Sequence, residues 1–242
     1  MPVSLEHEVA FWDAGANVVV GIDEVGRGAL AGPVSVGIVA LERCDTWPVG
    51  LADSKLLSPK RRVVMNDLLV GFGVARAVGH ASPQEIDDLG IVAALRLAGN
   101  RALASIAASG VEVDAILLDG KHDWLTPPDD DLFAASAGEF RDGHNSDGHN
   151  PDDAQEADAA TSSLPPVSMV IKGDNLCVSI AAGSVLAKVE RDAIMERLHH
   201  EHPQYGWAGN KGYGAEEHLA AIRTHGPTDQ HRRSWKLPER DV

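Results

Sequence analysis

The sequence predicts an α/β protein with a central mixed β-sheet flanked by helices. Two observations carry this prediction: short runs of β-branched apolar residues, typical of buried strands, alternate with longer stretches that have helical spacing and helix-start signals. The strand-like runs come first and the helical stretches mix in later, which favours one α/β layer system. A chain of 242 residues can bury a full core, so we expect one domain over residues 1–242.

Several apolar runs are predicted to be strands. Residues 18–22 and 34–41 are separated by a glycine-rich turn and predict an antiparallel hairpin. Residues 115–118 predict a short buried strand that ends at Asp119, and residues 167–171 predict another.

Helix-start signals and apolar spacing predict the helices. Ser58-Pro59 combines an N-cap with proline at the first helical position, and Ser82-Pro83 with Glu85 indicates another start. The last predicted helix has the strongest pattern, with its apolar residues on one side. The predicted helices are 60–69, a helix starting at Pro83, 91–108 and 178–200.

The net charge of −15 by itself disfavours contact with a phosphate backbone, which is met by Lys and Arg. Residues 129–158 hold ten acidic residues against Arg141 alone, so this stretch carries −9 and the rest of the chain −6. The segment 127–165 is rich in Asp, Gly, Asn, Ser, Ala and Pro and has neither a strand nor a helix period. We therefore expect a disordered acidic insertion at about 127–165.

No feature of the sequence points to a membrane or to secretion. No apolar run approaches the roughly 20 residues that span a bilayer, and residues 1–16 lack the basic and apolar regions of a signal peptide. Cys44 and Cys177 lie far apart and fit no metal-ligand spacing, as is usual where cysteines stay reduced. We expect a cytoplasmic protein without a membrane partner.

Asp23 and Glu24 end a buried apolar run just before a turn. An ionised carboxylate in apolar surroundings needs a hydrogen-bonded cation or a metal, so these acids are candidate ligands for Mg²⁺ or Mn²⁺. On this fragment alone, the start of a polar turn is an equally good interpretation. Because consecutive strand side chains point to opposite faces, Glu24 has to bend inward or ligate less directly.

Other acids follow the same logic further along the chain. Asp119 ends a predicted strand, and Ser184, Lys188 and Asp192 form one polar stripe along the last predicted helix. Taken alone, the stripe is better explained as a solvated helix face with an ordinary ion pair. Together with Asp23 and Glu24, however, Asp119 and Asp192 would supply the oxygen ligands of two cations about 4 Å apart, as phosphodiester hydrolysis requires.

With these residues in view, the chain resembles the ribonuclease HII family over nearly its whole length. The resemblance rests on ordered blocks rather than on one motif. The matching blocks are residues 21–33, 53–60, 117–120, 172–174, 179–192, 210–214 with His218, and 231–234.

The resemblance implies a ribonuclease H-like fold with a C-terminal helical segment, and a monomer. It also implies a mechanism with two divalent ions, Mg²⁺ or Mn²⁺, whose choice the sequence leaves open. The implied substrates are RNA·DNA hybrids and duplex DNA that contains single ribonucleotides. The RNA strand would be cut, 5′ to an embedded ribonucleotide, leaving a 3′-hydroxyl and a 5′-phosphate, which implies a role in removing misincorporated ribonucleotides.

The resemblance also implies residue roles. The catalytic acids and metal ligands would be Asp23, Glu24, Asp119 and Asp192. The substrate-binding residues would be Gly26, Arg27, Gly28, Lys55, Lys172, Ser184, Lys188 and Tyr213. Among them the loop 26–28 and Tyr213 would recognise the 2′-hydroxyl, the group that distinguishes RNA from DNA. Tyr205 remains a competing candidate for this contact, and Arg191 and Lys211 are further candidates for phosphate contacts.

Two rival functions stay open at this point. One is a catalytically silent module that only binds RNA·DNA duplexes, although such a module has no reason to hold four desolvated acids that repel phosphate. The other is a cation-binding acidic protein whose active part is the segment 127–165. Deleting that segment separates the cation binder from the other interpretations: nuclease activity should survive in an enzyme, whereas metal affinity would vanish in the cation binder.

Overall fold

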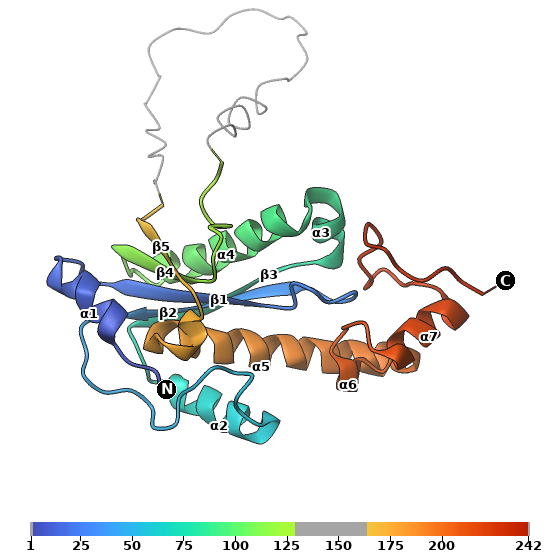
Figure 1. The fold of residues 1–242 in the computed structure, drawn as a ribbon, viewed down its shortest axis with the longest axis horizontal. Helices are drawn as coiled ribbons and strands as arrows, with labels where there is room; N and C mark the ends of the chain where they lie inside the picture. The colour runs from blue at the N-terminus through green and yellow to red at the C-terminus, as the bar shows by residue number, and fades with distance from the viewer. Residues whose placement is uncertain (1, 129–163, 242) are drawn as a thin grey trace, which may run out of the picture.

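A five-stranded mixed sheet forms the centre of the computed structural model, which describes residues 2–128 and 164–241 (Figure 1). Its strand order is β3-β2-β1-β4-β5, with β2 antiparallel to both of its neighbours, β1 and β3, and with β4 and β5 added in parallel beside β1. The α/β class, the mixed sheet and the hairpin are thereby confirmed. The strands are β1 (Val19–Val25), β2 (Val34–Leu41), β3 (Ala75–Ala81), β4 (Ala115–Asp119) and β5 (Val167–Val170).

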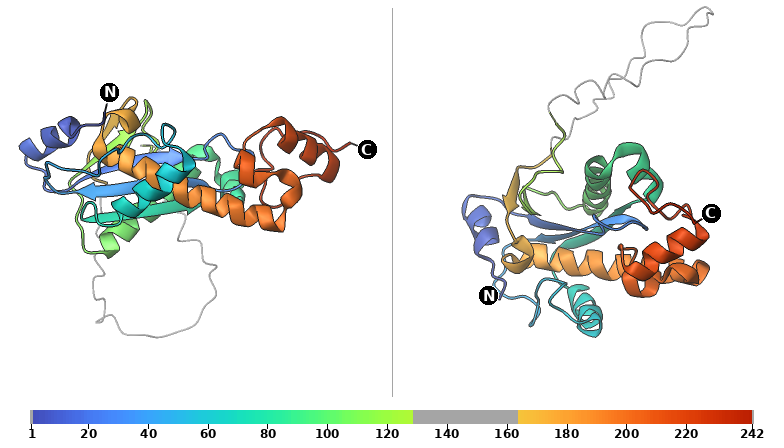
Figure 2. Two further views of the ribbon diagram at one scale, coloured as in Figure 1. Left: turned by 90° about the horizontal axis from the view of Figure 1, so that it is seen from below. Right: turned by 45° about the vertical axis from the view of Figure 1, so that its right-hand side comes forward.

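Helices cover both faces of this sheet (Figure 1). One face carries α5 and α2, the other α3 and α4, while α6 and α7 form the C-terminal helical segment beyond the sheet (Figure 2). The helices are α1 (Glu6–Asp13), α2 (Pro59–Leu69), α3 (Pro83–Leu89), α4 (Ile91–Ala108), α5 (Val178–Glu201), α6 (Trp207–Asn210) and α7 (Glu216–His225).

The predicted helix starts are confirmed by their capping contacts. The Ser58 hydroxyl accepts a hydrogen bond from the backbone N–H of Arg61, at the start of α2. At the start of α3, Ser82 and Glu85 form a reciprocal capping box, in which each side chain accepts from the other residue's backbone N–H. Local signals are therefore sufficient to place these two starts.

Helix α4 is long and apolar enough, by length and composition alone, to be a candidate membrane span. The sequence interpretation expected no span, because no apolar run approaches roughly 20 residues. In the fold, the buried residues of α4 pack with β2 and β3 in one of the two apolar clusters of the sheet. A core helix buried in this way passes the same composition test.

Helix α5 touches the sheet at the level of the backbone. A Cβ on Gly37 would lie 2.1 Å from the Gly183 carbonyl oxygen, and one on Gly21 would lie 2.3 Å from the Ile180 nitrogen. The expected one-sided apolar face is wrong for the first part of α5, where residues 178–187 are all buried. The sheet covers one side, and α2 with the loop before it covers the other.

Two parts of the sequence interpretation need a further comment. Neither α1 nor β3 was predicted, because both depend on contacts with distant parts of the chain. Most of the predicted acidic insertion, residues 129–163, lies outside the described residues, so its disorder stays a prediction.

Candidate active site

Three carboxylates from different segments converge at one edge of the sheet. Asp23 lies on β1, Asp119 ends the neighbouring parallel strand β4, and Asp174 lies in a 3₁₀ turn, Gly173–Asn175, after β5. One ligand oxygen from each lies within 4.8 Å of those of the other two. The backbone N–H of Gly173 donates to Oδ1 of Asp119 at 2.7 Å, which holds the turn beside β4.

Burial and mutual repulsion disfavour the charged form of the carboxylates in this cluster. Burial, followed by the neighbouring Glu24 and Asp119 carboxylates, raises the pKa of Asp23 well above its usual value. Burial also raises the pKa of Asp119, and the charge of Asp174 adds to that shift. Hard oxygen donors that repel one another in this way fit a divalent cation such as Mg²⁺ or Mn²⁺, which removes the repulsion.

Glu24 lies beside this cluster without entering the 4.8 Å group. Its backbone N–H donates to Oδ1 of Asp23 at 2.8 Å, and its carboxylate lies 3.6 Å from the Arg27 guanidinium. Burial raises the pKa of Glu24, Arg27 opposes the shift, and the charge of Asp119 adds to it. Glu24 is thus within electrostatic reach of Asp119, as expected for a less direct ligand.

A cleft of about 680 Å³ opens next to the carboxylates. At its rim, the Lys55 ammonium lies 3.1 Å from Oδ2 of Asp174 and 4.0 Å from Oδ1 of Asp53. Burial of Lys55 favours the neutral amine, but the Asp174 and Asp53 contacts outweigh it and raise the pKa of Lys55. Lys172 is exposed, with a left-handed backbone (φ 60°). The cleft is lined by Asp53, Lys55, Asp119, Ile171, Lys172, Asp174, Asn175 and Leu176.

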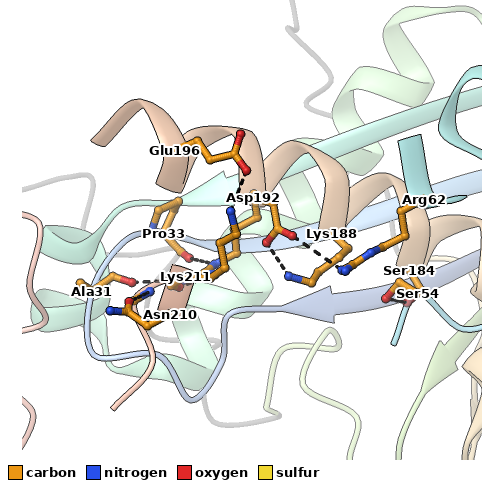
Figure 3. Close-up of polar contacts among 12 residues, drawn as sticks. Ala31, Pro33, Ser54, Arg62, Ser184, Lys188, Asp192, Glu196, Asn210 and Lys211 are labelled. Carbon is orange, nitrogen blue, oxygen red and sulfur yellow. Dashed lines mark hydrogen bonds and ion pairs between the residues drawn. The ribbon is translucent and has the colours of Figure 1, made fainter. Parts of the chain in front are cut away.

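Asp192 occupies a different place from the one its predicted role requires. Its carboxylate is paired with Lys188, one turn earlier on α5, and lies 3.6 Å from the Arg62 guanidinium of α2 (Figure 3). The structure does not bring it into the 4.8 Å group of Asp23, Asp119 and Asp174. Asp192 thus links two helices through cations, as an ion pair on the polar stripe would.

Ser184 is closed off from any substrate, contrary to its predicted contact. Its side chain is buried, and its hydroxyl oxygen lies 2.9 Å from that of Ser54 (Figure 3). A hydrogen bond from Ser184 lowers the pKa of Asp23, against the larger effect of burial. Ser184 is enclosed because residues 178–187 of α5 are all buried. Its contribution to the site is therefore the hydrogen bond to the Asp23 carboxylate.

The loop between β1 and β2, which contains residues 26–28, is joined to the segment before Tyr213 by backbone hydrogen bonds. Gly26 has a left-handed backbone (φ 87°), and its carbonyl accepts from the Arg232 guanidinium at 2.6 Å. The backbone N–H of Leu30 donates to the carbonyl of Gly212 at 2.8 Å, which joins the end of this loop to the residue before Tyr213. The structure therefore brings together the two elements that were expected to recognise a ribose.

The competition between the two tyrosines is decided by burial. Tyr205 is 2% exposed, and its hydroxyl donates to the carbonyl of Gly226 at 2.6 Å. Tyr213 is 39% exposed, with its ring 5.6 Å from the Arg191 guanidinium carbon. Tyr205 is a core residue with a satisfied hydroxyl, so Tyr213 alone of the pair is placed to meet a ligand.

The expected phosphate contact of Arg191 is wrong. Its side chain is fully buried, and its guanidinium donates to the carbonyls of Pro33, Lys211 and Ala31 at 2.8, 3.0 and 3.2 Å. Figure 3 labels the three residues whose carbonyls accept these bonds, Ala31, Pro33 and Lys211. Arg191 therefore connects α5, the loop after β1 and the segment before Tyr213 through backbone carbonyls.

Comparison with known proteins decides the family. A family model described as ribonuclease HII matches residues 20–132 and 142–238. The ribonuclease HII of Streptomyces avermitilis is 44% identical over 221 residues, which make up 91% of this chain and 78% of that protein. The chain belongs to the ribonuclease HII family. It is accordingly a ribonuclease H, an endonuclease of the hydrolase class.

Solved structures share the ribonuclease HII fold. The RNase HII of Archaeoglobus fulgidus, solved in complex with PCNA, has a TM-score of 0.62 at 21% identity, covering 93% of this chain and 98% of its own. Bst-RNase HIII, solved in complex with Mn²⁺, has a TM-score of 0.57 at 22% identity, covering 93% of this chain and 67% of its own. At these identities the likeness shows the fold, and it confirms the expected ribonuclease H-like architecture.

Asp174 is the site residue that the residue-role assignment missed. The sequence signal was available, because Asp174 ends the block 172–174 that resembles the ribonuclease HII pattern. It was overlooked because no predicted strand or helix carries it, whereas Asp192 lies on a strongly patterned helix. The contact between Gly173 and Asp119 shows that the 3₁₀ turn folds back to the sheet edge.

Proposed function

We propose that this ribonuclease HII hydrolyses the RNA strand of RNA·DNA hybrids and cuts 5′ to single ribonucleotides embedded in duplex DNA, leaving a 3′-hydroxyl and a 5′-phosphate. One observation carries the proposal. The acid cluster of Asp23, Asp119 and Asp174 and the ribose-recognition elements, loop 26–28 with exposed Tyr213, both lie along α5.

Asp23, Asp119 and Asp174, with Glu24 beside them, would hold the Mg²⁺ or Mn²⁺ ions, two of them in the catalytic complex. Such ions activate water and stabilise the leaving oxygen. The protein orients these ligands through hydrogen bonds. Ser184 donates one to the Asp23 carboxylate, and the backbone N–H of Gly173 donates one to the Asp119 carboxylate. In this proposal Asp174 takes the role that the sequence resemblance gave to Asp192.

The cations around the cleft are the proposed phosphate contacts. Lys55 and Lys172 lie at the cleft that the acids line, and Lys188 lies one helical turn beyond Ser184 on α5. Phosphate contacts position a duplex but carry no sequence information, as a ribonuclease H requires. Local positive charge of this kind lets a chain with a net charge of −15 approach nucleic acid.

Recognition of the ribose is proposed for the loop 26–28 and Tyr213. A Cβ at Gly28 would meet no atom within 4 Å, so the backbone there is open to a sugar. The exposed Tyr213 hydroxyl is both a donor and an acceptor, which suits the 2′-hydroxyl. A silent RNA·DNA-binding module is disfavoured, because clustered carboxylates repel a phosphate backbone unless cations offset them.

We also propose that the protein acts as a cytoplasmic monomer. Both cysteines are free, and one of them, Cys177, is buried. Sedimentation at working concentrations tests the monomer, and fractionation of cells that express the protein tests the location.

Cleavage of a DNA duplex with one ribonucleotide tests the proposed activity. Wild type and Asp23→Asn are compared in Mg²⁺ and in Mn²⁺, with an all-DNA duplex as the control substrate. A cut on the 5′ side of the ribonucleotide that disappears in the variant supports the proposal. Tight metal-dependent binding without a cut in either ion would replace it with the silent module.

A further inference from the structure

The turn before Tyr213 needs support from its surroundings. Lys211 and Gly212 have consecutive left-handed backbones (φ 52° and 83°), a conformation that is unfavourable for a lysine. The carbonyl of Lys211 accepts from Arg191, and that of Gly212 accepts from Leu30. Two of the three carbonyls in residues 211–213 are thus held, one by the Arg191 side chain of α5 and one by the backbone of Leu30.

The third carbonyl, that of Tyr213, is held from the opposite side by His218. Nδ1 of His218 on α7 lies 2.8 Å from the Tyr213 carbonyl oxygen. A carbonyl only accepts, so this nitrogen must carry a proton. His218 thus donates to the backbone of the residue that is proposed to contact the ribose.

The remaining contacts determine the other protons in this network. Nδ1 of His231 faces the backbone N–H of Thr228 at 3.0 Å, so it must accept, and in the neutral ring its Nε2 carries the proton. That Nε2 lies 3.1 Å from Nε2 of His218, which also accepts from the indole N–H of Trp207 at 3.0 Å. Each histidine is therefore neutral and in a single tautomer, and the chain of donors runs from Thr228 to Tyr213.

The surroundings favour this neutral arrangement. Both histidine side chains are at most 1% exposed. Burial lowers the pKa of His231 to about 4, with the neighbouring His218 adding to the shift, and burial lowers the pKa of His218 as well. At neutral pH the network is therefore intact.

We infer that His218, oriented by His231, is a positioning residue that sets where Tyr213 presents its hydroxyl to the ribose. The inference rests on the proposed function, because it concerns the residue proposed to read the 2′-hydroxyl. It predicts that the His218 contact to Tyr213 affects recognition of a ribonucleotide more than the stability of the fold.

Two substitutions of His218 separate positioning from simple packing. In His218→Asn the amide nitrogen lies near the place of Nδ1 and keeps a donor for the Tyr213 carbonyl. In His218→Gln the amide lies near the place of Nε2 and keeps the contacts to Trp207 and His231 instead. Both variants are made in the wild-type chain and in Tyr213→Ala, and thermal melting is measured for all of them.

The expected result is that His218→Gln loses roughly tenfold more kcat/KM than His218→Asn on a duplex with one ribonucleotide, mainly through KM. In the Tyr213→Ala background this difference should vanish, as a double-mutant cycle shows for a residue that acts through another. If neither variant of His218 folds, His231→Gln and His231→Leu provide the same comparison, because the glutamine amide keeps a donor for His218.

Equal losses for His218→Asn and His218→Gln, or a difference that persists without Tyr213, overturn the inference. These outcomes differ from a failure of the proposed function, in which the wild-type protein itself leaves the ribonucleotide-containing duplex uncut.

Discussion

The backbone N–H of Gly173 donates a hydrogen bond to Oδ1 of Asp119 over 2.7 Å. This contact joins residues that are 54 positions apart in the chain and places Asp174 next to the end of β4. It also explains why the carboxylate group at the sheet edge consists of Asp23, Asp119 and Asp174, while Asp192 is engaged by Lys188 and Arg62.

Metal binding should depend on Asp174 and not on Asp192. In proteins, loss of a group that hydrogen-bonds a metal ligand already weakens metal binding roughly 10- to 100-fold. Loss of the ligand itself in Asp174→Asn should therefore weaken Mn²⁺ binding at least as much. Asp192→Asn should leave Mn²⁺ affinity within about threefold of wild type, because its carboxylate pairs with Lys188 and Arg62 and is not a hydrogen-bond partner of Asp23, Asp119 or Asp174 in the described structure. Titration calorimetry with Mn²⁺ in the absence of substrate measures both. The reverse order of the two variants would restore Asp192 as the ligand.

Removing one acid of the cluster should stabilise the metal-free protein. The folded-state pKa of Asp23 is raised above its ordinary value of 3.8, so the folded state binds this proton more tightly and loses stability as the pH rises above that value. Asp23→Asn should therefore raise the melting temperature at pH 7 with EDTA present. The stabilisation that Mg²⁺ gives to wild type should be lost in the variant, and a lower melting temperature in EDTA would contradict the burial argument.

Close contact between α5 and the sheet should make Gly37 intolerant of a side chain. A Cβ there would lie 2.1 Å from the Gly183 carbonyl oxygen, and backbone atoms cannot move aside cheaply. Gly37→Ala should cost about 1–3 kcal/mol of unfolding free energy, as overpacked cores do. Gly71→Ala is the matched control, since a Cβ at Gly71 meets nothing within 4 Å. Denaturant unfolding of both variants gives the comparison, and equal stabilities would argue against this contact.

The two tyrosines should separate recognition from stability. Tyr205→Phe leaves the buried Gly226 carbonyl without its donor and should cost about 1–3 kcal/mol of stability, with little change in KM. Tyr213→Phe should leave the melting temperature nearly unchanged and reduce kcat/KM on a single-ribonucleotide duplex. Cleavage kinetics and thermal melting on the same preparations test both expectations. If Tyr205→Phe had a normal melting temperature but cleaved poorly, Tyr205 rather than Tyr213 would be assigned to ribose recognition.

The buried histidine pair should make the fold sensitive to acid. His231 has a folded-state pKa of about 4, below the ordinary 6.5, so the unfolded chain binds its proton first as the pH falls. Its stabilising contribution is complete above pH 6.5 and decreases between pH 6.5 and 4, by about 3 kcal/mol in total. The charged and titratable neighbours that enter this shift are His218, His202 and Arg233.

Urea unfolding of wild type and His231→Gln over this pH range measures the contribution of His231. The variant should have a flatter pH dependence than wild type, because glutamine does not titrate. Parallel curves for the two proteins would mean that the acid sensitivity comes from other groups.

Local signals carried most of the fold prediction. The bounds of β2 and α4 match the predicted segments 34–41 and 91–108, because apolar period and length are properties of the segment itself. The strand β3 was missed since its residues, with Arg76 and His80 among them, lack a strong β pattern. It is a strand because β2 pairs with it and because Gly79 lets α4 approach.

The site was predictable in its chemistry and only partly in its membership. Asp23 and Asp119 follow from acids at the ends of buried strands, a pattern that the sequence shows directly. Asp174 and the buried states of Ser184 and Arg191 depend on long-range packing, which no local spacing encodes. Similarly, α1 is held by Glu8, whose Oε1 accepts from the backbone N–H and the hydroxyl of Ser179, 171 positions away.

The glycine contacts that hold α5 against the sheet have a consequence for the position at which the protein would cleave its nucleic-acid substrate. Ser184, beneath the acid cluster, and Arg191, behind the recognition loop, are seven residues apart on one rigid helix, or roughly 10 Å at 1.5 Å per residue. A helix pressed onto backbone atoms cannot slide or tilt to change that interval. The distance between the acid cluster and the proposed ribose-binding loop is therefore fixed by α5. We expect every cut to fall at one constant number of nucleotides from the ribose that the loop binds.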